Sequence, residues 1–140
     1  MRYKKGIILV LTLLLAFIGF KAWNTYYINS MHVPISICDV ESIKFEGRAI
    51  KNSYKIATED EVKNVVTWFN SISNVRGNLD FQGTTADSHI IIILKSKKEI
   101  LIAKSGRDFE IQRYNSKGRW ISYWGKQADI RKILQEATYE

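Results

Sequence analysis

The sequence has almost none of the residues that build disulfide-bonded or metal-held folds. Its 140 residues include one cysteine, Cys38, and one proline, Pro34. A single cysteine excludes a disulfide within the chain, so the fold must rest on a hydrophobic core. The two histidines, His32 and His89, are not part of any His, Cys, Asp and Glu cluster with metal-ligand spacing. We therefore expect no structural metal and no cofactor.

Motifs of enzymes are also missing. No glycine-rich loop of the phosphate-binding kind precedes a helix. Asp87, Ser88 and His89 have the residue types of a catalytic triad, but neighbours in an extended chain point to opposite faces. Asp39 and Glu41 could form a carboxylate pair on one strand face, although solvated surface charge is the commoner role. We predict that the chain is not an enzyme, and the alternative is a cell-surface hydrolase that uses Asp39, Glu41 or His89.

The excess of positive charge is smaller in the folded part than in the whole chain. The net charge is +7, from 21 basic and 14 acidic residues. Four of the basic residues, Arg2, Lys4, Lys5 and Lys21, flank an apolar stretch, which leaves 17 basic residues and a net charge of +3 elsewhere. That charge is ordinary for a soluble surface. We therefore expect no nucleic-acid partner.

The feature that organises the chain is the apolar stretch Gly6–Phe20, which contains no charged residue. Extended to residues 6–23, it forms a helix of ~27 Å, which approaches a bilayer core of ~30 Å if the Lys21 amine reaches the interface. Residues 1–5 carry three basic side chains, so the positive-inside rule keeps them in the cytoplasm. We predict a single-pass anchor in the cell membrane, with the C-terminal domain outside.

A cleaved signal peptide is the alternative interpretation of the same stretch. After Phe20 the chain continues Lys-Ala-Trp-Asn-Thr, which has no pattern of small residues at alternate positions. Cys38 is too far from the apolar core for a lipoprotein signal. An uncleaved anchor is favoured, and a secreted domain remains the alternative.

The remainder of the chain divides into a juxtamembrane stalk, residues 24–38, and an α+β domain, residues 39–140. Apolar and polar residues alternate in 40–47, and a second short strand follows in 53–57. Thr58 and Glu61 form a capping box that predicts the start of a helix. That helix has an apolar stripe with i, i+3, i+4, i+7 spacing: Val62, Val65, Val66, Phe69 and Ile72.

Successive strand and turn signals follow the helix. Residues 73–87 are predicted to be a long irregular connection, and residues 89–94 a central strand covered on both faces, or partly covered by the anchor-proximal segment. Further strands are expected at 99–103, 109–113 and 119–124, and a helix at 128–137. The order ββα-ββββ-α indicates an antiparallel meander sheet with a helix on one face.

Two groups of residues are candidates for binding a partner. The first group comprises Lys95, Lys97 and Lys98, which could meet anionic headgroups or wall polymers, or could simply keep a turn soluble. The second group comprises the aromatic residues Trp120, Tyr123 and Trp124, which could stack on a ligand or partner, or could cover the core. We expect another envelope protein to be the partner, reached through a sheet edge or the connection 73–87.

The order of these signals resembles a known kind of protein. Val40-Glu41-Ser42-Ile43-Lys44-Phe45, the helix ending in Trp68-Phe69-Asn70-Ser71-Ile72, the strand Ile90–Leu94 and Arg119-Trp120 before a C-terminal helix carry the resemblance. They are similar to small exported α+β domains of unknown function from low-GC Gram-positive bacteria, which are lipoproteins or membrane-anchored chains. The resemblance implies an exported domain and transfers no catalytic residue. This chain departs from the lipoprotein members because no cysteine follows its apolar core.

Overall fold

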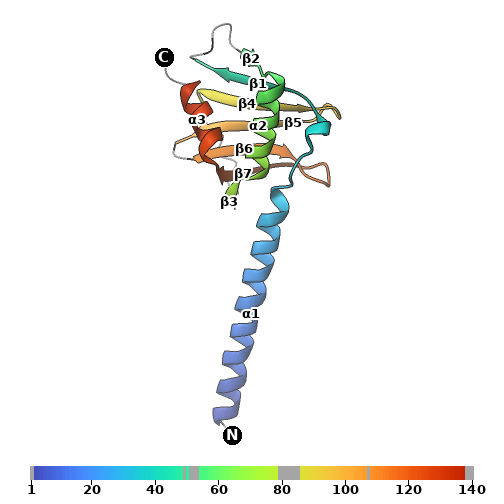
Figure 1. Cartoon of the computed structure of the whole chain (residues 1–140). Coiled ribbons are helices and arrows are strands. Elements are labelled where there is room, and N and C mark those ends of the chain that lie inside the picture. Colours follow the sequence, from blue (N-terminus) through green and yellow to red (C-terminus); the bar gives the residue numbers. More distant parts are fainter. Residues whose placement is uncertain (1, 49, 51–53, 79–85, 107, 138–140) are drawn as a thin grey trace. The chain divides into compact units, whose positions relative to one another are not determined.

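The computed structural model describes residues 2–48, 50, 54–78, 86–106 and 108–137 (Figure 1). The chain divides into two compact units, Met1–Ser30 and Met31–Glu140, which are described separately here. The first unit is a single helix, and the second is an α+β domain.

The N-terminal helix, α1, spans Arg2–Met31. Within it, Gly6–Ile28 is long and apolar enough to cross a membrane, and none of that segment is buried. The apolar N-terminal helix expected from the sequence is therefore present. It continues past residue 23, so the first part of the predicted stalk is helical. Pro34 explains where the helix stops, because a proline disfavours helical backbone in the residue before it.

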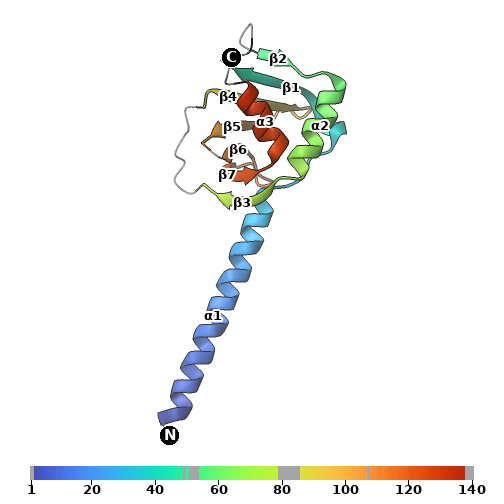
Figure 2. The same ribbon diagram turned by 60° about the vertical axis from the view of Figure 1, so that its left-hand side comes forward.

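The second unit is built on one seven-stranded sheet in which every neighbouring pair is antiparallel. The spatial order is β2-β1-β4-β5-β6-β7-β3. The strands are β1 (Val40–Gly47), β2 (Tyr54–Ile56), β3 (Ser73–Gly77), β4 (Ser88–Leu94), β5 (Glu99–Ser105), β6 (Asp108–Tyr114) and β7 (Trp120–Lys126). Helices α2 (Glu59–Asn70) and α3 (Ala128–Glu136) lie over the same face of this sheet (Figures 1 and 2). The predicted α+β fold with a meander sheet is confirmed.

One strand was missed by the sequence prediction. β3 lies inside the predicted irregular connection 73–87, where Ser73-Asn74-Val75-Arg76-Gly77 shows no clear strand pattern. It pairs with β7 through Arg76 opposite Trp124 and Gly77 opposite Tyr123, with a register shift between Ser73 and Arg76. Pairing with an existing strand, rather than local propensity, makes this segment a strand. Residues 79–85 of the predicted connection lie outside the described residues.

The core lies between the two helices and one face of the sheet. In each strand, alternate residues point toward the helices, and the cross-strand register aligns Ile43 with Ile92, Ile92 with Ile100, and Ile111 with Tyr123. These side chains are fully or almost fully buried. The helices cover them with Val65, Val66, Phe69, Ile130 and Leu134.

The capping box at the start of α2 is also confirmed. The Glu61 amide donates to Thr58 Oγ1 at 3.4 Å, and the Thr58 amide donates to Glu61 Oε2 at 2.8 Å. Hydrogen bonds of the Glu61 carboxylate to Lys55 and to the Thr58 amide lower the pKa of Glu61. The cap fixes where α2 begins. Val65, Val66 and Phe69 of the predicted apolar stripe are buried.

The folded unit begins earlier than the predicted boundary at residue 39. Met31 and Ile35 are buried and belong to the core cluster. Residues 31–39, called the strap below, include a short 3-10 turn, η1 (Ile37–Asp39), which leads into β1. The second half of the predicted stalk is therefore part of the domain.

The face of the sheet opposite α2 and α3, called the open face below, is covered by neither of these two helices (Figures 1 and 2). It carries Ile91, Ile93 and Leu101, which are half-buried. β4 was expected to be covered on both faces, or partly covered by the anchor-proximal segment. α2 and α3 cover only the face of β4 that holds Ile90 and Ile92.

Gly125 on β7 lies in a closely packed part of the core. A Cβ added there would lie 2.5 Å from Ile72 Cγ2 and 3.1 Å from Ile111 Cδ1. We expect Gly125→Ala to lower the unfolding free energy by about 1–3 kcal/mol, because overpacking forces buried side chains to shift. Thermal unfolding should show a melting temperature lower by several degrees. Unchanged stability would mean that this part of the core has free space.

Candidate functional site

The structure does not bring the six residues that the sequence proposed for partner binding into one surface. Lys95, Lys97 and Lys98 are exposed in the turn between β4 and β5. Trp120 is exposed at the start of β7, and Trp124 is half-buried farther along the same strand. Strand alternation directs both tryptophans to the open face. Tyr123 points the opposite way.

Tyr123 is a core residue. Its side chain is fully buried, and its hydroxyl lies 2.9 Å from His32 Nδ1. Burial raises the pKa of Tyr123 to about 12, although Arg113 nearby has the opposite effect. The ring meets His32 edge-on, with ring centroids 5.8 Å apart. Tyr123 therefore offers no surface to a partner, and the core alternative in the sequence analysis describes it.

His32 links the strap to both layers of the domain. Its Nε2 lies 2.9 Å from the carbonyl oxygen of Phe69 at the end of α2. A carbonyl can only accept, so Nε2 carries the proton and Nδ1 accepts from the Tyr123 hydroxyl. The imidazole also packs against the Phe69 ring, with centroids 4.8 Å apart. This arrangement suits the neutral form of His32.

Two further side chains fasten the strap. Asn70 makes a paired contact with Ile35: its Oδ1 accepts from the Ile35 amide at 2.8 Å, and its Nδ2 donates to the Ile35 carbonyl at 2.9 Å. Arg113 Nη1 donates to the Val33 carbonyl at 2.6 Å. These contacts satisfy main-chain groups of Val33 and Ile35, which lie outside the helices and strands. Sequence patterns gave no sign of them, because their partners lie far apart in the chain.

A polar cluster lies at one side of the open face. Glu110 is buried, and it accepts hydrogen bonds from Asn78 Nδ2 at 2.9 Å and from the Ser122 hydroxyl. Cross-strand register places Glu110 beside Trp124. The sequence placed Glu110 only within the expected strand 109–113, since its burial depends on partners from other strands.

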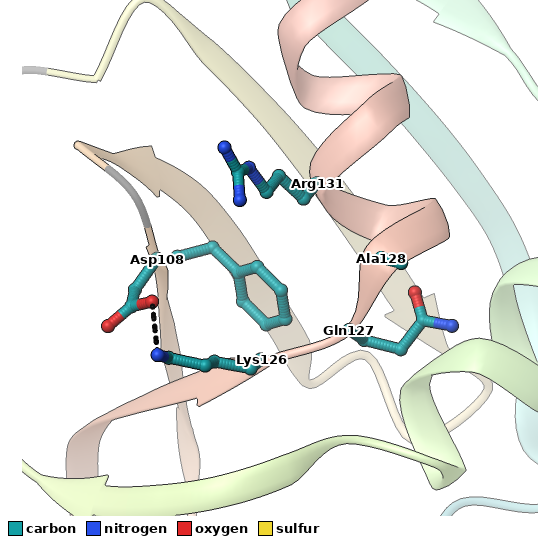
Figure 3. Close-up of a pocket in the computed structure, with 6 residues that line it drawn as sticks. Asp108, Lys126, Gln127, Ala128 and Arg131 are labelled. Carbon is teal, nitrogen blue, oxygen red and sulfur yellow. Dashed lines mark ion pairs between the residues drawn. The ribbon is translucent and has the colours of Figure 1, made fainter.

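A pocket of about 300 Å³ lies where β7 leads into α3 (Figure 3). Its lining residues are Asp108, Phe109, Lys126, Gln127, Ala128 and Arg131. Lys126 pairs with Asp108 at 3.6 Å, and Asp108 also pairs with Arg76. Gln127 Oε1 accepts from the Ile130 amide at 2.7 Å, so a side chain already caps the helix. The pocket is therefore not a vacant anion site, and we assign no ligand to it.

The candidate catalytic residues do not converge. Asp39 ends η1 and Glu41 lies at the start of β1, where its carboxylate pairs with Lys97 at 2.6 Å. His89 on β4 lies opposite Glu46 in the strand register, near the other end of β1. The hydrolase alternative requires these groups to share a cleft, and the structure separates them. No group of three or more His, Cys, Asp and Glu side chains that could hold a metal occurs among the described residues.

Comparisons with known proteins found no match for this chain among family models, curated proteins or solved structures. The function must therefore be inferred from the fold and the surfaces described above.

The His32 contacts predict a pH-dependent stability. Desolvation lowers the pKa of His32 below 6.5, with a smaller contribution from Arg113, although the bond to the Phe69 carbonyl opposes them. The unfolded chain then binds the proton more readily than the folded domain, so stability is complete above about pH 6.5 and is lost as the pH falls toward the folded pKa. Melting temperature measured against pH should show this loss.

Replacement of each histidine separates this effect from general acid destabilisation. His32→Gln should flatten the dependence of melting temperature on pH between about 6.5 and the folded pKa. His89→Gln is the matched control and should retain it. Equal slopes in the wild type and His32→Gln would contradict this account.

Proposed function

We propose that the chain is a single-pass membrane protein whose extracytoplasmic domain binds another protein of the cell envelope rather than catalysing a reaction. The apolar helix Gly6–Ile28 is long enough to serve as the anchor. Three basic residues before it, Arg2, Lys4 and Lys5, favour a cytoplasmic N-terminus and an external domain. The partner-binding role rests on a different observation, the composition of the open face.

The open face has apolar side chains where a solvated sheet face normally has polar ones. An antiparallel sheet with one face in water alternates apolar and polar residues. β4 does not, because Ile91 and Ile93 point away from the core while Ile90 and Ile92 point into it. Leu101 on β5 lies directly beside Ile91. This aliphatic patch is the observation that carries the proposal, since covering it would remove apolar surface from water.

The surroundings of the patch suit a protein partner. Lys44 lies next to Ile91 on one side, and Gln112 lies next to Leu101 on the other, so polar groups border the apolar centre. Trp124 adds a half-buried aromatic side chain on the same face. An apolar centre with a polar border and aromatic residues is the usual anatomy of a protein interface.

The edge strand β2 offers a second way to engage a partner at the same face. Tyr54 and Ile56 on this strand are exposed, and they border the open face through Lys44 and Glu46 of β1. An extended peptide could add to this edge through main-chain hydrogen bonds. The edge and the open face would then form one continuous binding surface.

Site-specific photocrosslinking in the native cells tests this proposal. A photoreactive amino acid at Leu101, in the full chain, should give an adduct of defined mass in the membrane fraction. The same amino acid at Asn64, on the exposed side of α2, should give none. The partner identified from the adduct should then bind the purified chain.

A charge on the patch provides the matched comparison. Ile91→Lys should abolish the Leu101 adduct, because it places a charge in the apolar centre of the contact. Thr67→Lys on α2 should leave the adduct unchanged, and melting curves should show that both variants fold. Identical adducts from Leu101 and Asn64, or none from Leu101 in a folded chain, would refute the proposed surface.

A further inference from the structure

One end of the sheet gathers features that the proposed function does not use. This turn end comprises the β4–β5 turn (95–98), the β6–β7 turn (115–119) and the strap. The register of Ile100 opposite Arg113 brings the two turns to the same end (Figure 1). The Lys95 amide donates to the Asp39 carbonyl at 2.8 Å, which holds the strap at that end.

The turn end carries most of the exposed apolar side chains of the domain. Six large hydrophobic residues are exposed in the described part of Met31–Glu140, and two of them, Tyr54 and Ile56, lie on β2. The other four lie at the turn end: Val33, Ile37, Tyr114 and Trp120, which are 48%, 40%, 43% and 40% exposed. The rings of Tyr114 and Trp120 meet edge-on, with centroids 4.9 Å apart. Tyrosine and tryptophan are the residues that favour the interface of a membrane with water.

Basic residues cluster in the two turns at this end of the sheet. The two turns hold five basic residues: Lys95, Lys97, Lys98, Lys117 and Arg119. Lys97 pairs with Glu41, whereas the other four have no ion pair among the described residues. Elsewhere in the domain, cations commonly sit beside acids, as in the pairs Arg48–Asp87, Lys55–Glu61 and Lys132–Glu136. The five basic residues, counted together with Asp39 of the strap and the adjacent carboxylates Glu41 and Glu99, leave a net charge of +2 at this end.

Few residues separate this surface from the candidate span in the sequence. Val33 follows Ile28, the last residue of the candidate span, by five residues. We propose that the turn end docks on the anionic lipid surface of the membrane in which the chain is anchored, with Trp120 and Tyr114 at headgroup level. This inference rests on the anchor in the proposed function, but it does not depend on the protein partner.

The covalent link to the proposed anchor helix allows a small surface to bind lipid. Four exposed apolar side chains and a net charge of +2 would bind a free domain to lipid only weakly. A short tether replaces a bimolecular encounter by an effective concentration that reaches ~mM for short linkers. Trp120 lies at the turn end of the open face, so docking there would leave the aliphatic patch of Ile91 and Leu101, farther along the strands, available to the proposed partner.

Environment-sensitive fluorescence in reconstituted vesicles tests this docking. The full chain with Cys38→Ser and Ser116→Cys carries the dye in the β6–β7 turn, and a second chain carries it at Ser105→Cys, at the opposite end of β5. Vesicles contain phosphatidylcholine alone or equal parts of phosphatidylcholine and phosphatidylglycerol. We expect a blue shift at position 116 in the anionic vesicles only, its loss in 1 M salt, where the Debye length is about 3 Å, and no shift at position 105.

Charge reversal supplies the matched variants. Lys95→Glu with Lys98→Glu should remove the blue shift at position 116, while Arg131→Glu with Lys132→Glu on α3 should retain it. Co-flotation with vesicles but no blue shift, or equal shifts at positions 105 and 116, would overturn the docking and leave the anchor intact. A chain that floats with neither kind of vesicle would overturn the anchor and the docking together.

Discussion

Burial of one isoleucine-rich face of the sheet beneath two helices is the constraint on which the rest of the structure depends. α2 and α3 cover the face that holds Ile43, Ile92 and Ile111, and these residues are fully buried. Because both of these helices lie on that face, neither of them covers the opposite one (Figure 2). The open face, with Ile91 and Leu101, follows from this one-sided arrangement, and the proposed partner would complete the second layer.

The strap connects this core to the N-terminal helix. His32 contacts Tyr123 of β7 and the last turn of α2, and Asn70 fixes both main-chain polar groups of Ile35. Buried polar contacts of this kind are costly to leave unmade, so the strap is a defined part of the domain rather than a loose linker.

Most of the fold could be predicted from the sequence because its elements carry local signals. The capping box at Thr58 and Glu61, the alternation in β1 and the turn at Asn115–Gly118 all correspond to described structure. β3 and the strap could not be predicted in this way, because β3 depends on pairing with β7 and the strap depends on Asn70 and Arg113. The candidate site was predictable only in part. Composition identified the aromatic strand and the lysine turn, but only the packing shows that Tyr123 is buried while Trp120 is exposed.

Labelling of the single native thiol tests the central claim, an anchored domain outside the cell membrane. Cys38 is exposed in η1, so a membrane-impermeant maleimide can reach it if the domain is external. Asn64→Cys on α2 provides a second exposed position, away from the proposed lipid contact. The account predicts labelling of full-length, membrane-bound chain at both positions in intact cells. Labelling only after lysis, or recovery of a shortened chain in the medium, would contradict it.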